Sequence, residues 1–101
     1  MKAVKVEYTV RPEFLEQNKA NIKKVMGHIK MNPIDGMLYS TFTKEDGLTF
    51  VHINISKDQK TLDKINEVQE FIEFKRALKE SNPIESPKST KLDLVAAGFG
   101  L

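Results

Sequence analysis

The 101-residue chain contains no cysteine and no tryptophan, and it has only two histidines. Without cysteine it can form no disulfide, no thiolate nucleophile and no cysteine-ligated zinc site. Because the lack of disulfides is typical of a reducing compartment, we expect a cytoplasmic protein. No stretch approaches the roughly 18 apolar residues of a membrane-spanning helix. The opening stretch MKAVKVEYTV lacks the apolar core of a signal peptide, so we expect neither a membrane span nor a leader.

Neither sign of charge dominates, since 16 Lys and Arg residues stand against 14 Asp and Glu residues and the net charge is +2. Proteins that bind nucleic acid or anionic membranes usually concentrate a larger positive excess, so we expect neither partner. A 40% share of hydrophobic residues suits one folded domain over residues 1–101. A chain this short leaves much surface exposed, and a second subunit covering one sheet face would relieve that exposure.

Hydrophobic periodicity first predicts a strand, a helix and a hairpin. Apolar and polar residues alternate in AVKVEYTV (3–10), which indicates a strand with one covered face. After Pro12 the apolar residues recur at helical spacing, and NPIDG (32–36) ends that helix. Two strands, 37–44 and 48–56, follow on either side of the short loop EDG, which is typical of a hairpin.

The second half of the chain predicts a broken helical region and a last strand. Ser56 and Gln59 have the spacing of a capping box. A change of apolar register predicts a kink near Asn66 and then a helix to about Lys79. A polar, proline-bearing connection leads to a strand over residues 90–98. The order β-α-β-β-α-β is that of the α+β ferredoxin-like fold, a four-stranded antiparallel sheet with two helices on one face.

The two faces of this sheet are predicted to differ. We expect the helices to cover the more regular apolar series: Val4, Val6, Tyr8, Leu38, Phe42, Val51, Ile53, Ile55, Leu92 and Leu94. The open face would carry a mixed series: Lys5, Glu7, Thr9, Tyr39, Thr41, Phe50, His52, Asn54, Asp93 and Val95. A solvated surface, a dimer interface that encloses a pocket and an RNA platform are the three interpretations. We favour the pocket, because aromatic and small polar groups at strand centres suit a buried site.

The RNA interpretation depends on the stretch DGLTFVHI in the predicted third strand. RNA-recognition domains carry a basic residue, a glycine and stacking aromatic residues there. Gly47, Phe50 and Val51 match that pattern, but Asp46 stands at the basic position and aliphatic residues replace two of the stacking rings. Nucleic-acid binding is therefore not predicted.

His52 is the leading candidate for a catalytic group. Imidazole titrates near neutral pH and can act as a base or as a hydrogen-bond donor to a phenolic or enolic substrate. Asn54 lies one step along the same face and could hold a developing oxyanion. The alternative is that His52 is a hydrogen-bonded histidine of an interface. The candidate substrate-binding residues are Glu7, Asn18, Tyr39, Phe50 and Asp93.

Carboxylates near an imidazole would orient it, which is the role considered for Glu7 and Asp93; the alternative is a surface ion pair. Asn18 interrupts the apolar stripe of the first helix and either reaches the cavity mouth or has a boundary role. The two histidines lie on different elements, and no spacing of ligands predicts a metal site.

Over residues 3–97 the layout resembles the antibiotic-biosynthesis-monooxygenase-like proteins of the dimeric α+β barrel group. The resemblance is carried by EYTVRPE, by DGMLYSTF, and by FVHINIS leading into KDQKTLDKINEVQEFIEFKRAL. Members of that group pair their sheets as homodimers, and some oxidise quinols or aromatic polyketides without metal or flavin.

The resemblance implies a homodimer that binds a small organic molecule, aromatic or of quinol type, on its sheet face. It makes the protein a candidate cofactor-independent monooxygenase, for which no cofactor is expected. The alternative is a non-catalytic ligand-binding or interaction module of the same fold. Members of the group often have a histidine just before the phenylalanine of the second helix, where this chain has Val68-Gln69-Glu70-Phe71. Haem degradation is therefore not expected.

Overall fold

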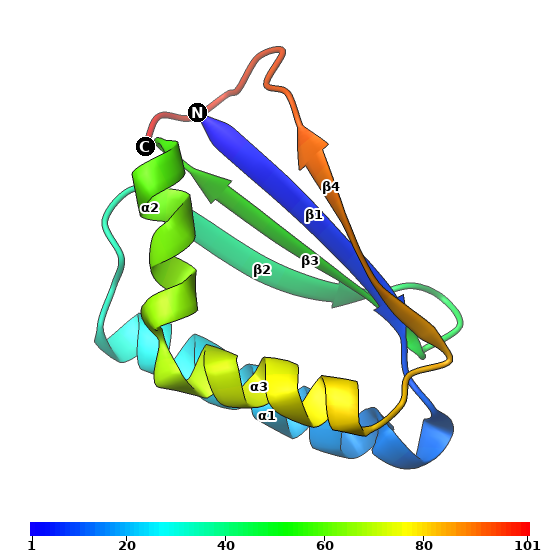
Figure 1. The fold of residues 1–101 in the computed structure, drawn as a ribbon. Helices are drawn as coiled ribbons and strands as arrows, with labels where there is room; N and C mark the ends of the chain where they lie inside the picture. Colours follow the sequence, from blue (N-terminus) through cyan, green and yellow to red (C-terminus); the bar gives the residue numbers. More distant parts are fainter.

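The computed structural model describes residues 1–101, and its helices pack on one face of a four-stranded sheet (Figure 1). The strands are β1 (Lys2–Thr9), β2 (Met37–Thr43), β3 (Thr49–Ser56) and β4 (Glu85–Leu92). They lie in the order β2-β3-β1-β4, and every neighbouring pair is antiparallel. The structure therefore confirms the predicted α+β, ferredoxin-like arrangement.

The helical layer has two long helices and one short one. A 3-10 turn, η1 (Pro12–Phe14), leads into α1 (Leu15–Met31), while α2 (Gln59–Asp63) continues through η2 (Lys64–Glu67) to α3 (Gln69–Glu80). Val68 has an extended backbone between η2 and α3, which confirms the predicted kink. Helices α1 and α3 run side by side, and α2 stands near one end of the sheet (Figure 1).

The start of α2 differs from the prediction. Asp58 is the N-cap, and its Oδ1 accepts a hydrogen bond from the Thr61 backbone N–H at 2.8 Å. Ser56 is still part of β3, where its hydroxyl donates to Asn54 Oδ1 at 2.8 Å. The capping box predicted from Ser56 is therefore wrong, because Ser56 is the last residue of β3 and the helix begins after Asp58.

The last strand also lies earlier than predicted. β4 ends at Leu92, which pairs with Ala3 near the start of β1, so a strand over 90–98 would have run past its partner. Residues 93–101 form no regular strand. β4 is an exposed edge strand, where a residue such as Pro87 is tolerated because one side of the strand forms no ladder. The alternation in TKLDLVAAG was misleading because pairing with β1 ends at Leu92, and the residues beyond it have no strand to pair with.

The register of the sheet shows which face the helices cover. Val6 is paired with His52, and Tyr8 with Phe50, and directly paired residues project to the same side. The rings of Tyr8 and His52 both pack against Phe74 of α3, with centroids 6.4 and 5.2 Å away. His52 therefore lies beneath the helices.

The predicted face of β1 is confirmed, but the faces of β2 and β3 were assigned the wrong way round. The open face carries Leu38, Phe42, Val51, Ile53 and Ile55, whereas Tyr39, Thr41, Phe50, His52 and Asn54 face the helices. Leu92, paired with Ala3, also belongs to the open side. Alternation groups the residues of one strand by face, but it does not say which face meets the helices. In β3 the aliphatic residues lie on the open face and Phe50 is the one apolar residue that faces the helices, so the usual contrast indicated the wrong face.

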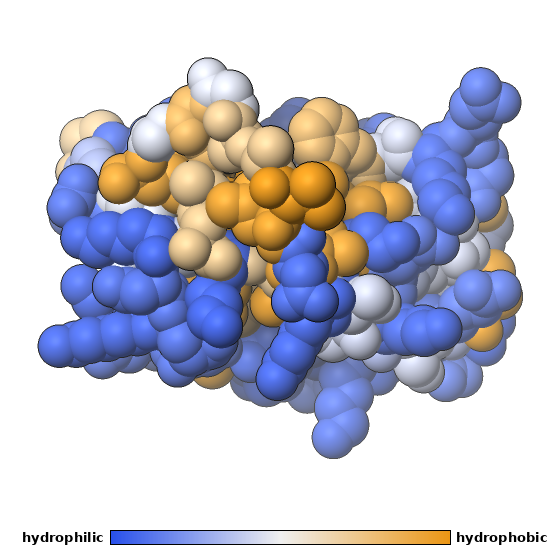
Figure 2. All heavy atoms as spheres, turned by 90° about the horizontal axis from the view of Figure 1, so that it is seen from above, coloured by the Kyte–Doolittle hydropathy of each residue, from blue (hydrophilic) through white to orange (hydrophobic).

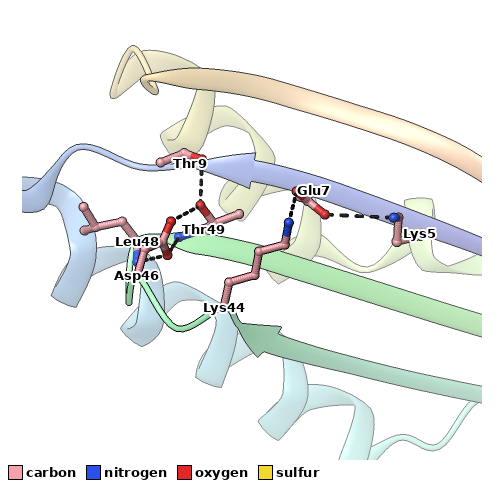
Figure 3. Close-up of polar contacts among 7 residues, drawn as sticks. All are labelled: Lys5, Glu7, Thr9, Lys44, Asp46, Leu48 and Thr49. Atoms are coloured by element: carbon pink, nitrogen blue, oxygen red, sulfur yellow. Dashed lines mark hydrogen bonds and ion pairs between the residues drawn. The ribbon is translucent and has the colours of Figure 1, made fainter.

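The open face is apolar at its centre and held by polar contacts at one end. Figure 2 shows apolar surface gathered on the side turned away from α1 and α3, with hydrophilic residues around it. Leu38 and Phe42 are 46% and 57% exposed. At the hairpin end, Lys44 binds Glu7, and Asp46 accepts hydrogen bonds from the backbone N–H of Thr49 and from its hydroxyl (Figure 3).

Candidate functional site

A cavity of about 570 Å³ lies between the sheet and the helical layer. Strand residues Tyr39, His52 and Asn54 contribute to its floor, and Phe71 and Phe74 of α3 to its wall. The pocket predicted at a dimer seam on the open sheet face is therefore found on the opposite face, within one chain. Nine of its 18 lining residues are hydrophobic, and a small group of polar side chains converges at the floor, a composition that suits a small organic molecule.

A chain of hydrogen bonds crosses the core and ends at this cavity. Asn18 of α1 donates from Nδ2 to the Tyr8 hydroxyl at 2.9 Å. The Tyr8 hydroxyl lies 2.7 Å from His52 Nε2, and His52 Nδ1 lies 2.7 Å from the Tyr39 hydroxyl and 3.0 Å from Thr41 Oγ1. Asn18, Tyr8 and His52 are buried, whereas Tyr39 is half-buried and lines the cavity. Tyr39 is therefore the end of the chain that a ligand can reach.

The tautomer of His52 follows from counting protons along this chain. The Tyr8 hydroxyl already accepts from Asn18, so its own proton is satisfied only by donation to His52 Nε2. The imidazole proton then lies on Nδ1 and is donated towards Tyr39 or Thr41. With the proton on Nε2, the buried Tyr8 hydroxyl would have no acceptor, which is costly. The favoured tautomer leaves the Tyr39 proton available to a molecule in the cavity.

Burial keeps the titratable side chains of this hydrogen-bond chain, His52, Tyr8 and Tyr39, uncharged near neutral pH. It lowers the pKa of His52 to about 4, because the imidazolium would lose its hydration. Burial likewise raises the pKa values of Tyr8 and Tyr39 well above the ordinary value for a phenol. The site therefore presents neutral hydrogen-bond donors rather than charges at its floor.

Asn54 supplies a second donor to the floor of the cavity. Its Oδ1 accepts from Ser56, and its Nδ2 contacts Met37 Sδ at 3.8 Å. Sulfur is a weak acceptor, and the amide nitrogen carries two protons, so Asn54 retains donor capacity at the cavity. Two donors, from Tyr39 and Asn54, thus meet at the floor of the cavity.

No protein-family model matches the sequence, and no curated protein matches it significantly. Solved structures do match its fold. An antibiotic biosynthesis monooxygenase superposes with a TM-score of 0.80 at 17% identity, over 95% of this chain and 100% of that one. The Mycobacterium tuberculosis protein Rv0793 gives a TM-score of 0.83 at 16% identity, over 97% and 98% of the two chains.

The chain has the fold of the antibiotic biosynthesis monooxygenases. A mutant of a cofactor-independent oxygenase from Streptomyces nogalater shares this fold, with a TM-score of 0.72 at 10% identity over 96% of this chain and 95% of that one. At such low identities the match describes the arrangement of the backbone. What the site can do must be derived from its own residues.

The antibiotic biosynthesis monooxygenase fold does not bring all the predicted site residues together. Tyr39, His52 and Asn54 meet at the cavity, and Asn18 reaches it only through Tyr8. Phe50 is a core residue whose ring stacks on Tyr8 at 5.5 Å.

The expectation that two carboxylates share a face with His52 is wrong. Glu7 lies on the open face of the sheet, where Lys44 binds it at 2.8 Å and lowers its pKa. Asp93 follows β4 and is exposed in the C-terminal segment. Neither carboxylate lines the cavity.

The sequence did not single out Tyr8 or the residues of α3 as site residues. Tyr8 was assigned to the core, where it does lie, but its hydroxyl joins Asn18 to His52. The signal was present: an asparagine interrupts an apolar helix stripe, and a tyrosine lies on an apolar strand face. Two buried polar groups require partners, and the Asn18 amide nitrogen and the Tyr8 hydroxyl are partners of each other, although Asn18 Oδ1 is left unpaired.

The structure contains no group of three or more side chains that could hold a metal ion. None of its helices is both long enough and apolar enough to span a bilayer.

Proposed function

We propose that the protein binds a small aromatic molecule in the cavity beneath its helices and oxidises it with dioxygen, without a cofactor. The observation that carries this proposal is the hydrogen-bond chain from Asn18 to Tyr39, which ends at the floor of an apolar cavity. The oxygenase of Streptomyces nogalater that shares the fold supports the same reaction class. The proposed substrate is a phenol, a quinol or an enolisable aromatic ketone.

The floor of the cavity suits the anion of such a substrate. Hydrogen bonds from the Tyr39 hydroxyl and the Asn54 amide would stabilise a phenolate or enolate oxygen. That anion is electron-rich and can reduce dioxygen. One oxygen atom then enters the substrate, and the other leaves as water with two hydrogens that the substrate supplies, so dioxygen is the only oxidant. His52 acts here as a donor that orients Tyr39, since its other nitrogen is occupied by Tyr8.

Oxidation of 1,4-dihydroxynaphthalene under ¹⁸O₂ tests the reaction. We expect oxygen uptake above the uncatalysed rate and one labelled atom in the product, detected by mass spectrometry. Tyr39→Phe and His52→Gln should each lower the rate at least tenfold, whereas Glu7→Gln, on the other sheet face, should leave it unchanged. Full activity in the Tyr39 and His52 variants would refute the assigned roles.

A non-catalytic ligand-binding module is the second candidate, and the state of His52 favours it. Both ring nitrogens are hydrogen-bonded inside the protein, and burial holds the pKa at about 4, so the imidazole is a weak base. This candidate predicts saturable binding of the naphthalene compound with no oxygen uptake above the background in any variant.

We also propose that the protein is a homodimer, paired through the open face of the sheet as in a dimeric α+β barrel. The support is the apolar surface at the centre of that face, which includes Phe42 and Ile53 and which no element of the chain covers. Sedimentation should show a dimer at micromolar concentration. Ile53→Lys should shift it to a monomer, whereas Ile72→Lys, on the exposed side of α3, should not. A monomeric wild-type protein would refute the dimer.

A further inference from the structure

Helix α3 presents two parallel rows of residues to the cavity. Residues four apart lie on the same side of a helix, so Phe74 and Leu78 form one row and Phe71, Lys75 and Lys79 form the next. Phe74 and Leu78 are buried, whereas Lys75 and Lys79 are exposed, and all five line the cavity. The cavity therefore changes along its depth from an apolar wall to a rim that carries two ammonium groups.

These two ammonium groups have no counter-charge. Neither Lys75 nor Lys79 belongs to an ion pair of the structure, and no aspartate or glutamate lines the cavity. Elsewhere in the chain lysines do pair with carboxylates, as Lys44 does with Glu7. The rim is thus a local positive field above an uncharged floor, and an anion entering the cavity would be the first negatively charged partner of these lysines.

The path from rim to floor is lined by aromatic rings. Lys75 Nζ lies 5.0 Å from the centre of the Phe71 ring. The Phe71 ring meets the Tyr39 ring edge-on at 6.1 Å, and the Tyr39 hydroxyl contacts His52. A planar ligand that packs against Phe71 would direct one end to the Tyr39 hydroxyl and the other to the lysines.

We propose that the ligand of the cavity is an aromatic anion, a flat ring system with a carboxylate that the Lys75 and Lys79 ammonium groups hold at the rim. This inference rests on the proposed function, in that it requires the cavity to bind an aromatic molecule, and it adds the charge and its position. The ring system fills the apolar wall, an oxygen substituent on the far side meets Tyr39 and Asn54, and the carboxylate stays at the hydrated mouth.

The test compares 2-naphthoate with 2-naphthamide, which has nearly the same shape but no charge, by isothermal titration calorimetry at pH 7.5. The wild-type protein should bind naphthoate about fivefold more tightly than naphthamide, a difference of about 1 kcal/mol, as expected for one to two exposed ion pairs. K75Q/K79Q should reduce the ratio to about one while leaving the naphthamide affinity unchanged. The control K23Q/K30Q removes two exposed lysines of α1 outside the cavity lining and should keep the ratio.

Raising the salt concentration from 0.05 to 0.5 M provides a second measurement, since it should weaken naphthoate binding and not naphthamide binding. Equal affinities in the wild type, or a preference for naphthoate that survives K75Q/K79Q, would overturn the anionic ligand and leave aromatic binding in place. Absence of binding for both compounds would overturn the proposed function together with this inference.

Discussion

Lowering the pH from 7 to 4.5 should destabilise the protein through His52. The pKa of this imidazole is about 4 in the folded protein and about 6.5 in the unfolded chain, because burial opposes the charged form. Between these pH values the unfolded state binds a proton that the folded state does not bind. The free energy of unfolding therefore falls as the pH falls below 6.5, and it is unaffected by His52 above that pH.

The size of the effect follows from the difference between the two pKa values. Each pH unit changes the free energy of unfolding by about 1.4 kcal/mol while only the unfolded state is protonated. For a difference of about 2.5 pH units the full loss is about 3.4 kcal/mol, of which more than 2 kcal/mol should appear by pH 4.5. Domains of this size have total stabilities of about 5–15 kcal/mol, so the loss is easily measured.

Urea denaturation at pH 7.0, 6.0, 5.0 and 4.5, at fixed protein concentration, measures the loss in the wild type and in His52→Gln. The variant is less stable at pH 7, but it should lose at least 2 kcal/mol less on acidification. Carboxylates with lowered pKa values, such as Asp46 and Asp58, also destabilise the fold in acid, but they are present in both proteins and cancel in the difference. Parallel pH profiles would refute the reasoning. So would an imidazole that titrates near 6.5 by NMR in a His28→Gln background, where His52 is the only histidine.

Three further substitutions should change stability in urea or thermal denaturation. Tyr8→Phe leaves His52 Nε2 and the Asn18 amide without a partner and should cost about 2–3 kcal/mol; a neutral result would show that the chain of hydrogen bonds is not formed. Asp58→Ala removes the N-cap of α2 and should cost about 1 kcal/mol, while Asp58→Asn should retain most of the stability. Gly36→Ala should lower the melting temperature by several degrees, since φ is +79° there and an added Cβ would collide with the side chain of Lys57; an unchanged melting temperature would contradict this.

The order of elements was predictable because each has a period and a boundary signal in the sequence. Pro12 and the NPIDG turn bound the first helix, and the changed apolar register near Asn66 corresponds to η2 and the extended Val68. The last strand was misplaced because its pairing with β1, and not its own alternation, decides where it lies. β4 is polar and exposed, so its sequence resembles a loop.

The sequence predicted which strand residues share the site, but it did not predict which face of the sheet carries the site. His52, Asn54 and Tyr39 were grouped correctly, since alternation fixes which residues of a strand share a side. Which side meets the helices depends on the packing of α1 and α3, and β3 carries its aliphatic residues on the open side. Glu7 and Asp93 were predicted as site residues because the site was expected on the open face. The cavity lies on the other face, so neither carboxylate lines it. The α3 residues were missed because a helix row that ends in two lysines resembles an ordinary solvated surface.

Substitutions at the floor of the cavity and at its rim should differ in their cost to the stability of the fold. The floor residues Tyr39, His52 and Asn54 are tied to buried partners, so a substitution there alters the core as well as the ligand contacts. Lys75 and Lys79 are exposed and unpaired, and replacing them costs the fold little. The charge at the mouth of the cavity can therefore be changed through one exposed row of α3, without disturbing the hydrogen-bonded interior beneath it.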